Sequence, residues 1–219
     1  MKLIKSISLA AVLVTSFLSV NTVSADAGDW LVRGRLINVS PNDDSGTLTD
    51  FTNSYARVED ATTLEVDFTY MVTNNLGLEL ILGTTKHDIY GGADLTFLNK
   101  IVEAGVLPPT LTLQYHFAPK AKIRPYAGVG VNYTYFYGEK ASKSYTDTLG
   151  GTSVDLDDSW GLAAQVGVDF DINKNWFINF DVKFIDIDTT ASLTTGATVR
   201  TIDVDIDPWV FGIGVGTRF

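Results

Sequence analysis

The chain has 219 residues, of which 45% are hydrophobic and 11% aromatic, and its formal net charge at pH 7 is −10. So acidic a protein is not expected to bind nucleic acid. The absence of cysteine excludes disulfides, thiolate metal sites and a cysteine nucleophile. After residue 25 there is no run of about 18 apolar residues, so the rest of the sequence predicts no transmembrane helix.

Residues 1–25 are predicted to be a secretory signal peptide. Lys2 and Lys5 precede an apolar stretch from Ile7 to Val20, and Val23-Ser24-Ala25 supplies small residues for cleavage, with a second option after Ala27. A membrane anchor is the alternative, but serine and threonine dilute the apolar run. Cleavage after residue 25 would remove two lysines and no acid, leaving a net charge of −12.

Eight segments alternate apolar side chains with polar or small ones, as strands with two different faces do. In chain order they are Trp30–Val39, Thr63–Val72, Leu76–Gly83, Thr110–Phe117, Arg124–Tyr137, Asp158–Ile172, Trp176–Ile187 and Arg200–Phe219. In the last segment the alternation shifts by one residue near Asp207-Pro208, where a β-bulge would account for it.

The connections between these segments alternate in length. Residues 73–75, 118–122 and 173–175 form short turns, whereas residues 40–62, 84–109, 138–157 and 188–199 form long loops. Within the second long loop, Asp94 is predicted to cap a short helix that ends at Gly105. The helix would share one apolar face between Leu95, Leu98, Ile101 and Val102.

The predicted fold is all-β, a single eight-stranded antiparallel transmembrane β-barrel formed by residues 26–219. Short periplasmic turns, long extracellular loops and aromatic residues near both strand ends are typical of bacterial outer-membrane barrels. The last strand would close the barrel, because an exposed apolar strand ending at Phe219 would aggregate in water. A soluble β-sandwich is the alternative, and it would need a second sheet to bury one face of each strand.

Eight strands leave an interior filled by side chains, which excludes a broad water-filled pore. Its lower part is predicted to be a polar plug whose charges neutralise each other. The plug residues are Arg33, Arg35, Glu65, Asp67, Glu79, Asp169 and Asp181. Above them Ile81, Phe136 and Ile185 point into the upper lumen. A blocked floor and an open top favour lateral release into lipid, since each methylene gains about 0.8 kcal/mol on leaving water.

Other residues suggest metal binding or catalysis only weakly. Five aspartates near the outer strand ends could bind a divalent ion, although solvated acids are the favoured interpretation. They are Asp186, Asp188, Asp203, Asp205 and Asp207. For His87 and His116 we expect hydrogen-bonded structural roles. No Ser–His–acid set is evident, so no enzyme activity, catalytic residue, metal or cofactor is predicted.

Several stretches together resemble the outer-membrane protein W (OmpW) family. They are Phe68–Met71, Leu107–Thr110, Arg124–Tyr133, Asp158–Gly161, Gln165–Asp169, Asp186–Ala191 and Asp207–Phe211. The resemblance implies strands that project beyond the outer leaflet and uptake of small hydrophobic compounds that leave sideways through the wall. It also implies an apolar constriction at positions corresponding to Ile81 and Lys183. Lys183 departs from the large aromatic residue of the best-known relative.

Lys183 has two interpretations. It could join Asp181 or Glu79 in the plug, or it could favour an amphipathic solute with an acid group. With either role, the sequence predicts a narrow passive channel for small hydrophobic or amphipathic molecules, with a lateral opening near Asp207-Pro208. Expected partners are outer-membrane lipid, lipopolysaccharide, the solutes, and the assembly machinery through Phe219. The alternative is a structural or receptor barrel whose loops bind phage, bacteriocins or host surfaces.

Overall fold

The computed structural model describes residues 26–219, and the predicted signal peptide lies outside the described residues. Eight antiparallel strands form a closed barrel, in which β15 pairs with β1 and β9 pairs with β11. The strands are β1 (Trp30–Ser40), β4 (Ala61–Met71), β5 (Leu76–Gly83), β8 (Thr110–His116), β9 (Ile123–Ala141), β11 (Ser159–Asp171), β12 (Trp176–Ile185) and β15 (Trp209–Arg218). The predicted barrel and its order of strands are therefore confirmed.

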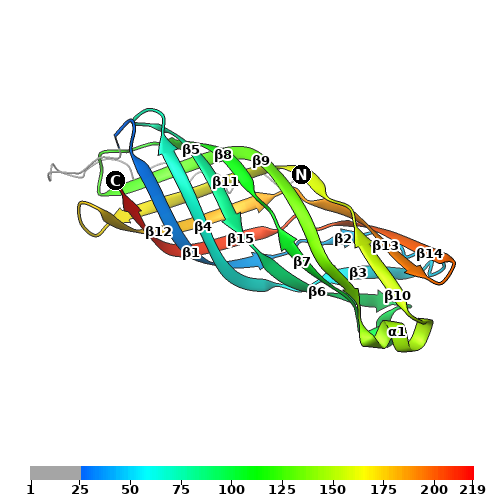
Figure 1. The fold of residues 1–219 in the computed structure, drawn as a ribbon. Coiled ribbons are helices and arrows are strands. Elements are labelled where there is room, and N and C mark those ends of the chain that lie inside the picture. The colour runs from blue at the N-terminus through cyan, green and yellow to red at the C-terminus, as the bar shows by residue number, and fades with distance from the viewer. Residues whose placement is uncertain (1–25) are drawn as a thin grey trace, which may run out of the picture.

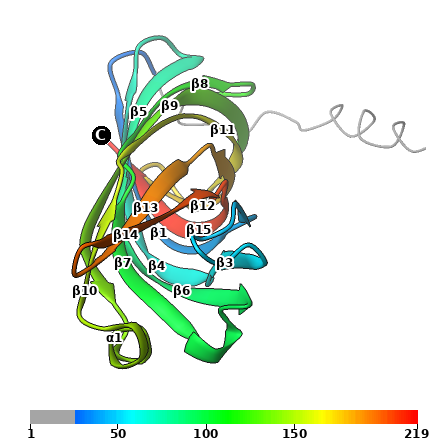
Figure 2. The ribbon, with the colours of Figure 1, turned by 90° about the vertical axis from the view of Figure 1, so that its right-hand side faces the viewer.

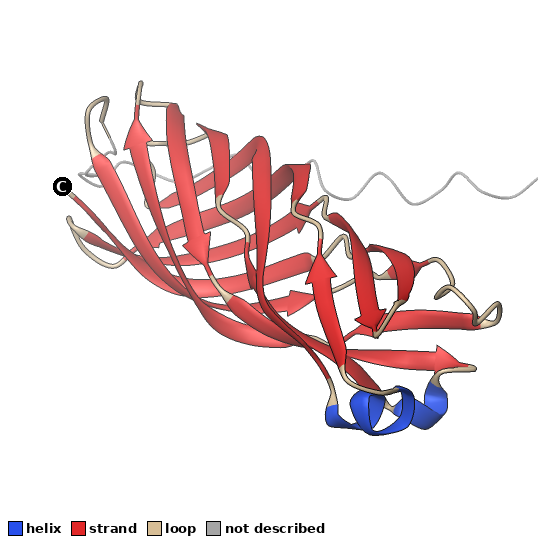
Figure 3. Ribbon diagram, turned by 45° about the vertical axis from the view of Figure 1, so that its right-hand side comes forward, coloured by secondary structure: helices blue, strands red, loops and turns tan. Residues whose placement is uncertain are grey.

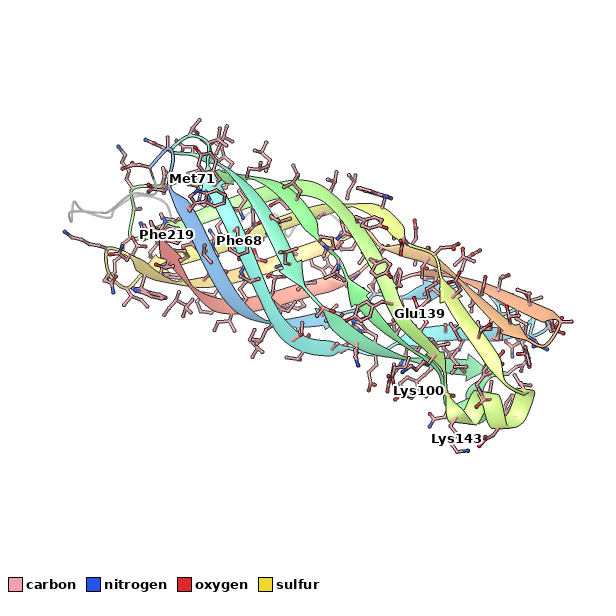
Figure 4. The ribbon with its side chains drawn as sticks, viewed as in Figure 1. Phe68, Met71, Lys100, Glu139, Lys143 and Phe219 are labelled. Atoms are coloured by element: carbon pink, nitrogen blue, oxygen red, sulfur yellow. The ribbon has the colours of Figure 1, made fainter. Side chains whose placement is uncertain are left out.

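At one end of the barrel the strands are joined by short turns. Figure 1 places the C-terminus at this end, and Phe68, Met71 and Phe219 lie toward it in Figure 4. The backbone of Phe219 exchanges two hydrogen bonds with Trp30, which has its N–H 2.9 Å from the Phe219 oxygen. This exchange joins the last strand to the first and removes both sheet edges.

At the other end the barrel continues into a long extension (Figures 1 and 3). The long connections, predicted as loops, contain strands that continue the wall. These elements are β2 (Asp44–Ser45), β3 (Ser54–Val58), β6 (Thr85–Ala93), the 3₁₀ turn η1 (Thr96–Leu98), β7 (Lys100–Leu107), the helix α1 (Lys143–Leu149), β10 (Thr152–Leu156), β13 (Asp188–Thr195) and β14 (Thr198–Asp205). Within residues 26–219, no helix is long and apolar enough to cross a membrane.

The extension is made of two sheets that curve around one interior, as the view along the molecule shows (Figure 2). One sheet consists of β3, β6, β7 and the upper half of β9, and the other of β10, β13, β14 and β2. In space, β10, β13 and β14 continue the barrel strands β11, β12 and β15 into the extension, beyond a kink. The two sheets therefore meet at two seams, β2 with β3 and β9 with β10.

Two sequence predictions about this region are wrong. The predicted helix between Asp94 and Gly105 is only the turn η1 followed by strand β7. Leu95, Leu98, Ile101 and Val102 are buried, but they pack into the core of the extension. The predicted strand Arg200–Phe219 is two strands, because β14 ends at Asp205 and Asp207 takes a positive φ of 40° before β15 begins.

The outer face of the barrel is a belt of apolar side chains. Leu64 and Trp160 are each 73% exposed, and Val129 is 65% exposed. Aromatic pairs lie at both margins, with Trp30 against Tyr70 near the short turns and Phe184 against Trp209 near the extension. Such a belt between two aromatic girdles suits lipid hydrocarbon and would be unfavourable in water.

Candidate functional site

The lower interior of the barrel holds a network of buried ion pairs. Neighbouring strands place Arg33 opposite Asp67 and Arg35 opposite Glu65 in register, so opposite charges meet across the β1–β4 pair. The Arg33 guanidinium lies 2.9 Å from Asp67 and 3.2 Å from Asp169. These side chains are buried, which makes a partner for each charge essential.

A second group of contacts extends the network across the barrel. The Arg35 guanidinium lies 2.7 Å from Glu65 and 3.0 Å from Asp67. The Lys183 ammonium lies 2.8 Å from Glu65 and 2.7 Å from Asp181. The structure thus brings Lys183 into the charged network with Asp181, as one interpretation expected, but its second partner is Glu65 and not Glu79.

Uncharged polar groups complete the network. Thr112 Oγ1 donates to Glu79 Oε2 at 2.8 Å, and Tyr126 Oη donates to Asp181 Oδ2 at 2.9 Å. Tyr126 fits because Gly167 lies opposite, where a Cβ would fall 2.3 Å from its ring. The network therefore fills the barrel cross-section with paired charges, and we call it the charged floor.

Sequence reasoning missed the base of the charged floor. Arg124 and Arg218 both bind Asp171, and the guanidiniums of Arg33, Arg124 and Arg218 lie 5.2–5.6 Å from the centre of the Phe177 ring. Cations over an aromatic face are attracted by its quadrupole. Each of these side chains lies an even number of residues from an inward-facing neighbour on the same strand, so alternation alone could have placed them inside.

Above the charged floor lies an apolar chamber, which continues from the barrel into the extension. The lining is mostly isoleucine, valine, leucine and alanine from both sheets. Among the described residues that line it, Glu65 is the one formally charged side chain and His87 the one histidine. Ile81, Phe136 and Ile185 line this chamber, whereas Lys183 does not.

The far end of the chamber is covered, although the sequence predicted an open top. Leu48, Leu95, Leu98 and Tyr145 are at most 1% exposed, belong to one apolar cluster with residues of both sheets, and do not line the chamber. We call these four residues the apical cap. They come from the β2–β3 connection, from η1 and the residue before it, and from α1, which lies at the tip of the molecule in Figure 1.

The wall of the chamber is interrupted at Pro108-Pro109. The β5–β8 ladder ends with Ile81 opposite Thr110, and the β6–β7 ladder resumes with Thr85 opposite Val106. Between them, residues 82–84 have no cross-strand partner in residues 107–109. The cause is chemical, since proline has no N–H to donate to a ladder. Gly83, Thr84 and Pro108 line the chamber at this break.

The predicted lateral opening near Asp207-Pro208 is not present. Ile185 N–H donates to the Pro208 oxygen at 3.3 Å, and Ile206 N–H donates to the Ile187 oxygen at 2.8 Å. Ile187 N–H also donates to the Asp207 carboxylate at 3.1 Å. The strands kink together here, and hydrogen bonds cross the kink.

Of the remaining candidate residues, His87 lines the chamber and the others lie outside its lining. Asp188 pairs in register with Asp205, and Asp203 accepts a hydrogen bond from Thr190. Within the part of the chain that the structure describes, no group of three or more acidic or histidine side chains could hold a metal ion. His116 Nε2 lies 3.1 Å from Gln114 Oε1 in the floor, and both ring nitrogens of His87 have partners at 2.8 Å.

A closed eight-stranded barrel with an apolar belt, two aromatic girdles and an interior without a water-filled pore defines a small outer-membrane β-barrel protein. Comparison with known proteins narrows this class. The chain belongs to the OmpW family, whose family model matches residues 26–219. The resemblance seen in the sequence is thereby confirmed, and so is the location in the bacterial outer membrane, surrounded by lipid and lipopolysaccharide.

Similar proteins cover three quarters or more of the chain. The outer membrane protein W of Salmonella typhi is 38% identical over 217 residues, which are 98% of this chain and 100% of that protein. The crystal structure of OprG from Pseudomonas aeruginosa has a TM-score of 0.84 and 34% identity, covering 90% of this chain and 99% of that one. A dibenzothiophene metabolism operon protein, PahQ of Pseudomonas aeruginosa, is 31% identical over 75% of this chain and 74% of that protein.

Proposed function

We propose that the protein is a passive channel for the uptake of small hydrophobic molecules, which it releases sideways into the outer membrane. The observation that carries the proposal is the chamber, whose lining is apolar and which ends on a floor of paired charges. A hydrophobic solute is favoured in the chamber by about 0.8 kcal/mol per methylene removed from water. The same solute would have to disrupt buried ion pairs to cross the charged floor.

The break at Pro108-Pro109 is the proposed exit. Leu107 pairs with Tyr135, and Tyr133 packs against Trp160, so the break lies at the level of the outer aromatic girdle. A solute leaving there would enter lipid directly. The dibenzothiophene operon of the relative PahQ supports a hydrophobic aromatic solute, because dibenzothiophene is an uncharged fused-ring compound.

Three further assignments belong to the same proposal. The channel acts without catalysis, because the solute moves from one environment to another without any chemical change. Residues 1–25 are the export signal, cleaved after Ala25 or Ala27. Phe219, which is 71% exposed at the end of the closing strand, is the residue that the outer-membrane assembly machinery recognises.

The test is uptake of an uncharged hydrophobic dye, such as N-phenyl-1-naphthylamine, by vesicles whose outer leaflet is lipopolysaccharide. Wild-type protein should accelerate entry over protein-free vesicles, and Ile81→Arg should abolish the acceleration, because it places a charge in the apolar lining. The conservative variant Ile81→Leu should retain it. Equal rates with wild type and Ile81→Arg would favour the structural or receptor barrel.

A further inference from the structure

At the seam between β9 and β10, two strands of the extension lie side by side without a backbone ladder. The β9–β11 ladder ends with Thr134 opposite Ser159. Above it, β9 pairs with β7 on its other side, and β10 pairs with β13. Among the described residues, no cross-strand pair joins residues 135–141 to residues 152–157, a stretch about 20 Å long at about 3.3 Å per residue.

The second seam, between β2 and β3, shows that the gap at β9–β10 is not a general property of the two sheets. Across it Ala56 N–H donates to Ser45 Oγ at 2.8 Å, and Val58 N–H donates to Asp43 Oδ2 at 3.2 Å. Side chains therefore accept hydrogen bonds from the backbone N–H groups at the edge of β3. At the β9–β10 seam one carboxylate makes the connection, with Asp158 accepting from Tyr133 Oη at 2.6 Å and from Phe136 N–H at 3.3 Å.

The backbone of β9 is irregular just above this connection. Gly138 has a positive φ of 65°, and the β7–β9 register shifts between Glu103 and Gly105, which is the signature of a β-bulge. If the β9–β11 register continued upward, Lys140 would lie opposite Ser153. This pairing is absent, and the bulge lies in the same stretch of β9.

The chamber reaches both sides of the seam. Phe136 from β9 and Leu156 from β10 line it, and Tyr135 and Tyr137 stack at a centroid distance of 6.3 Å on the adjoining part of β9. The apical cap covers the tip, and the charged floor closes the base. A solute from outside therefore meets a packed core at the tip, whereas at the side it meets an unpaired boundary at which Phe136 and Leu156 face the chamber.

We propose that the β9–β10 seam is the entrance of the channel, through which small uncharged hydrophobic molecules pass from the outside into the chamber, with Asp158 holding its lower edge. The inference rests on the proposed function, since it assigns the entry step of the same route. Entry and exit then lie on different strand boundaries, because the break at Pro108-Pro109 lies where the β5–β8 ladder gives way to the β6–β7 ladder.

The test uses the absence of native cysteine to staple the seam. Lys140→Cys with Ser153→Cys, both exposed positions, is joined by a reducible bis-maleimide. The matched control is Ser153→Cys with Thr194→Cys, which staples strands that already pair in register. Dye uptake into lipopolysaccharide-bearing vesicles should fall several-fold on stapling the first pair, recover on reduction, and stay unchanged with the control staple.

Three outcomes separate the possibilities. Uptake that is undiminished after stapling the seam would overturn the entrance, whereas absence of uptake with unstapled wild type would overturn the proposed function itself. If the first staple does not form, Asp158→Ala replaces it. This variant should raise dye uptake and speed amide hydrogen exchange in residues 135–141, and unchanged uptake would overturn the entrance.

Discussion

Lys183 and Glu65 form an ion pair at the boundary between the charged floor and the apolar chamber, with the Lys183 ammonium 2.8 Å from the Glu65 carboxylate. Glu65 lines the chamber, whereas Lys183 lies below its lining, with 1% of the residue exposed. The lysine is therefore held by two carboxylates of the protein. An acid group on a solute would have to compete with both for it.

Lys183→Trp should leave the transport of uncharged hydrophobic molecules intact. The reason is that the chamber and both wall interruptions are built from other residues, while the ammonium belongs to the floor. Dye uptake by lipopolysaccharide-bearing vesicles measures this, and circular dichroism checks that the barrel has folded. Loss of neutral transport in a folded variant would contradict the assignment of Lys183 to the floor.

Arg35→Met should destabilise the barrel strongly. It leaves Glu65 and Asp67 buried with fewer cations, and removing one partner of a buried ion pair costs about 3–5 kcal/mol. Urea unfolding in lipid vesicles, followed by tryptophan fluorescence, gives the change in the free energy of unfolding. Lys143→Met is the control, because its pair with Asp147 is exposed on α1 and its loss should change stability little.

Pro108→Ala combined with Pro109→Ala should slow release into lipid. The two alanines would supply the missing N–H groups. Residues 82–84 could then pair with residues 107–109, which would close the gap between the β5–β8 and β6–β7 ladders. Dye uptake should fall several-fold while thermal stability rises or stays the same. Pro119→Ala, in the short turn between β8 and β9, serves as the matched control. Unchanged uptake in the double variant would place the exit elsewhere.

The barrel was predictable because lipid imposes a strict alternation on each strand. The segment predicted at Leu76–Gly83 has the bounds of β5, and Arg33, Arg35, Glu65 and Asp67 all point inward as their parity requires. The charged floor was predictable from the sequence for the same reason. Its base was missed because Arg124 and Arg218 lie at strand ends next to the short turns, and the plug was predicted from residues farther along the strands.

The extension was less predictable because its order depends on contacts between distant segments. Leu95, Leu98, Ile101 and Val102 have helical spacing, yet they are buried against β14 and α1 from other parts of the chain. The wall interruptions were not predictable for a similar reason. Pro108-Pro109 and Gly138 lie at them, but only the register of the neighbouring strands shows which strand boundary is unpaired.

A pH dependence should arise in the extension from His87. Its Nδ1 lies 2.8 Å from the Glu59 oxygen and its Nε2 lies 2.8 Å from Thr85 Oγ1. Burial lowers the pKa of His87 below its ordinary value of 6.5, although the Glu59 oxygen and the nearby Asp60 and Asp88 favour the cation. The folded extension therefore binds this proton less readily than the unfolded chain does.

The sign of the effect follows from this difference in proton binding. The contribution of His87 to stability is complete above about pH 6.5 and is lost as the pH falls below that value toward the lower pKa of the folded state. Amide hydrogen exchange in β6 and β7 should accelerate between pH 6.5 and 5, after correction for intrinsic rates. His87→Gln, which keeps a polar group without titrating, should remove this part of the pH dependence. An identical pH profile in wild type and His87→Gln would show that another group is responsible.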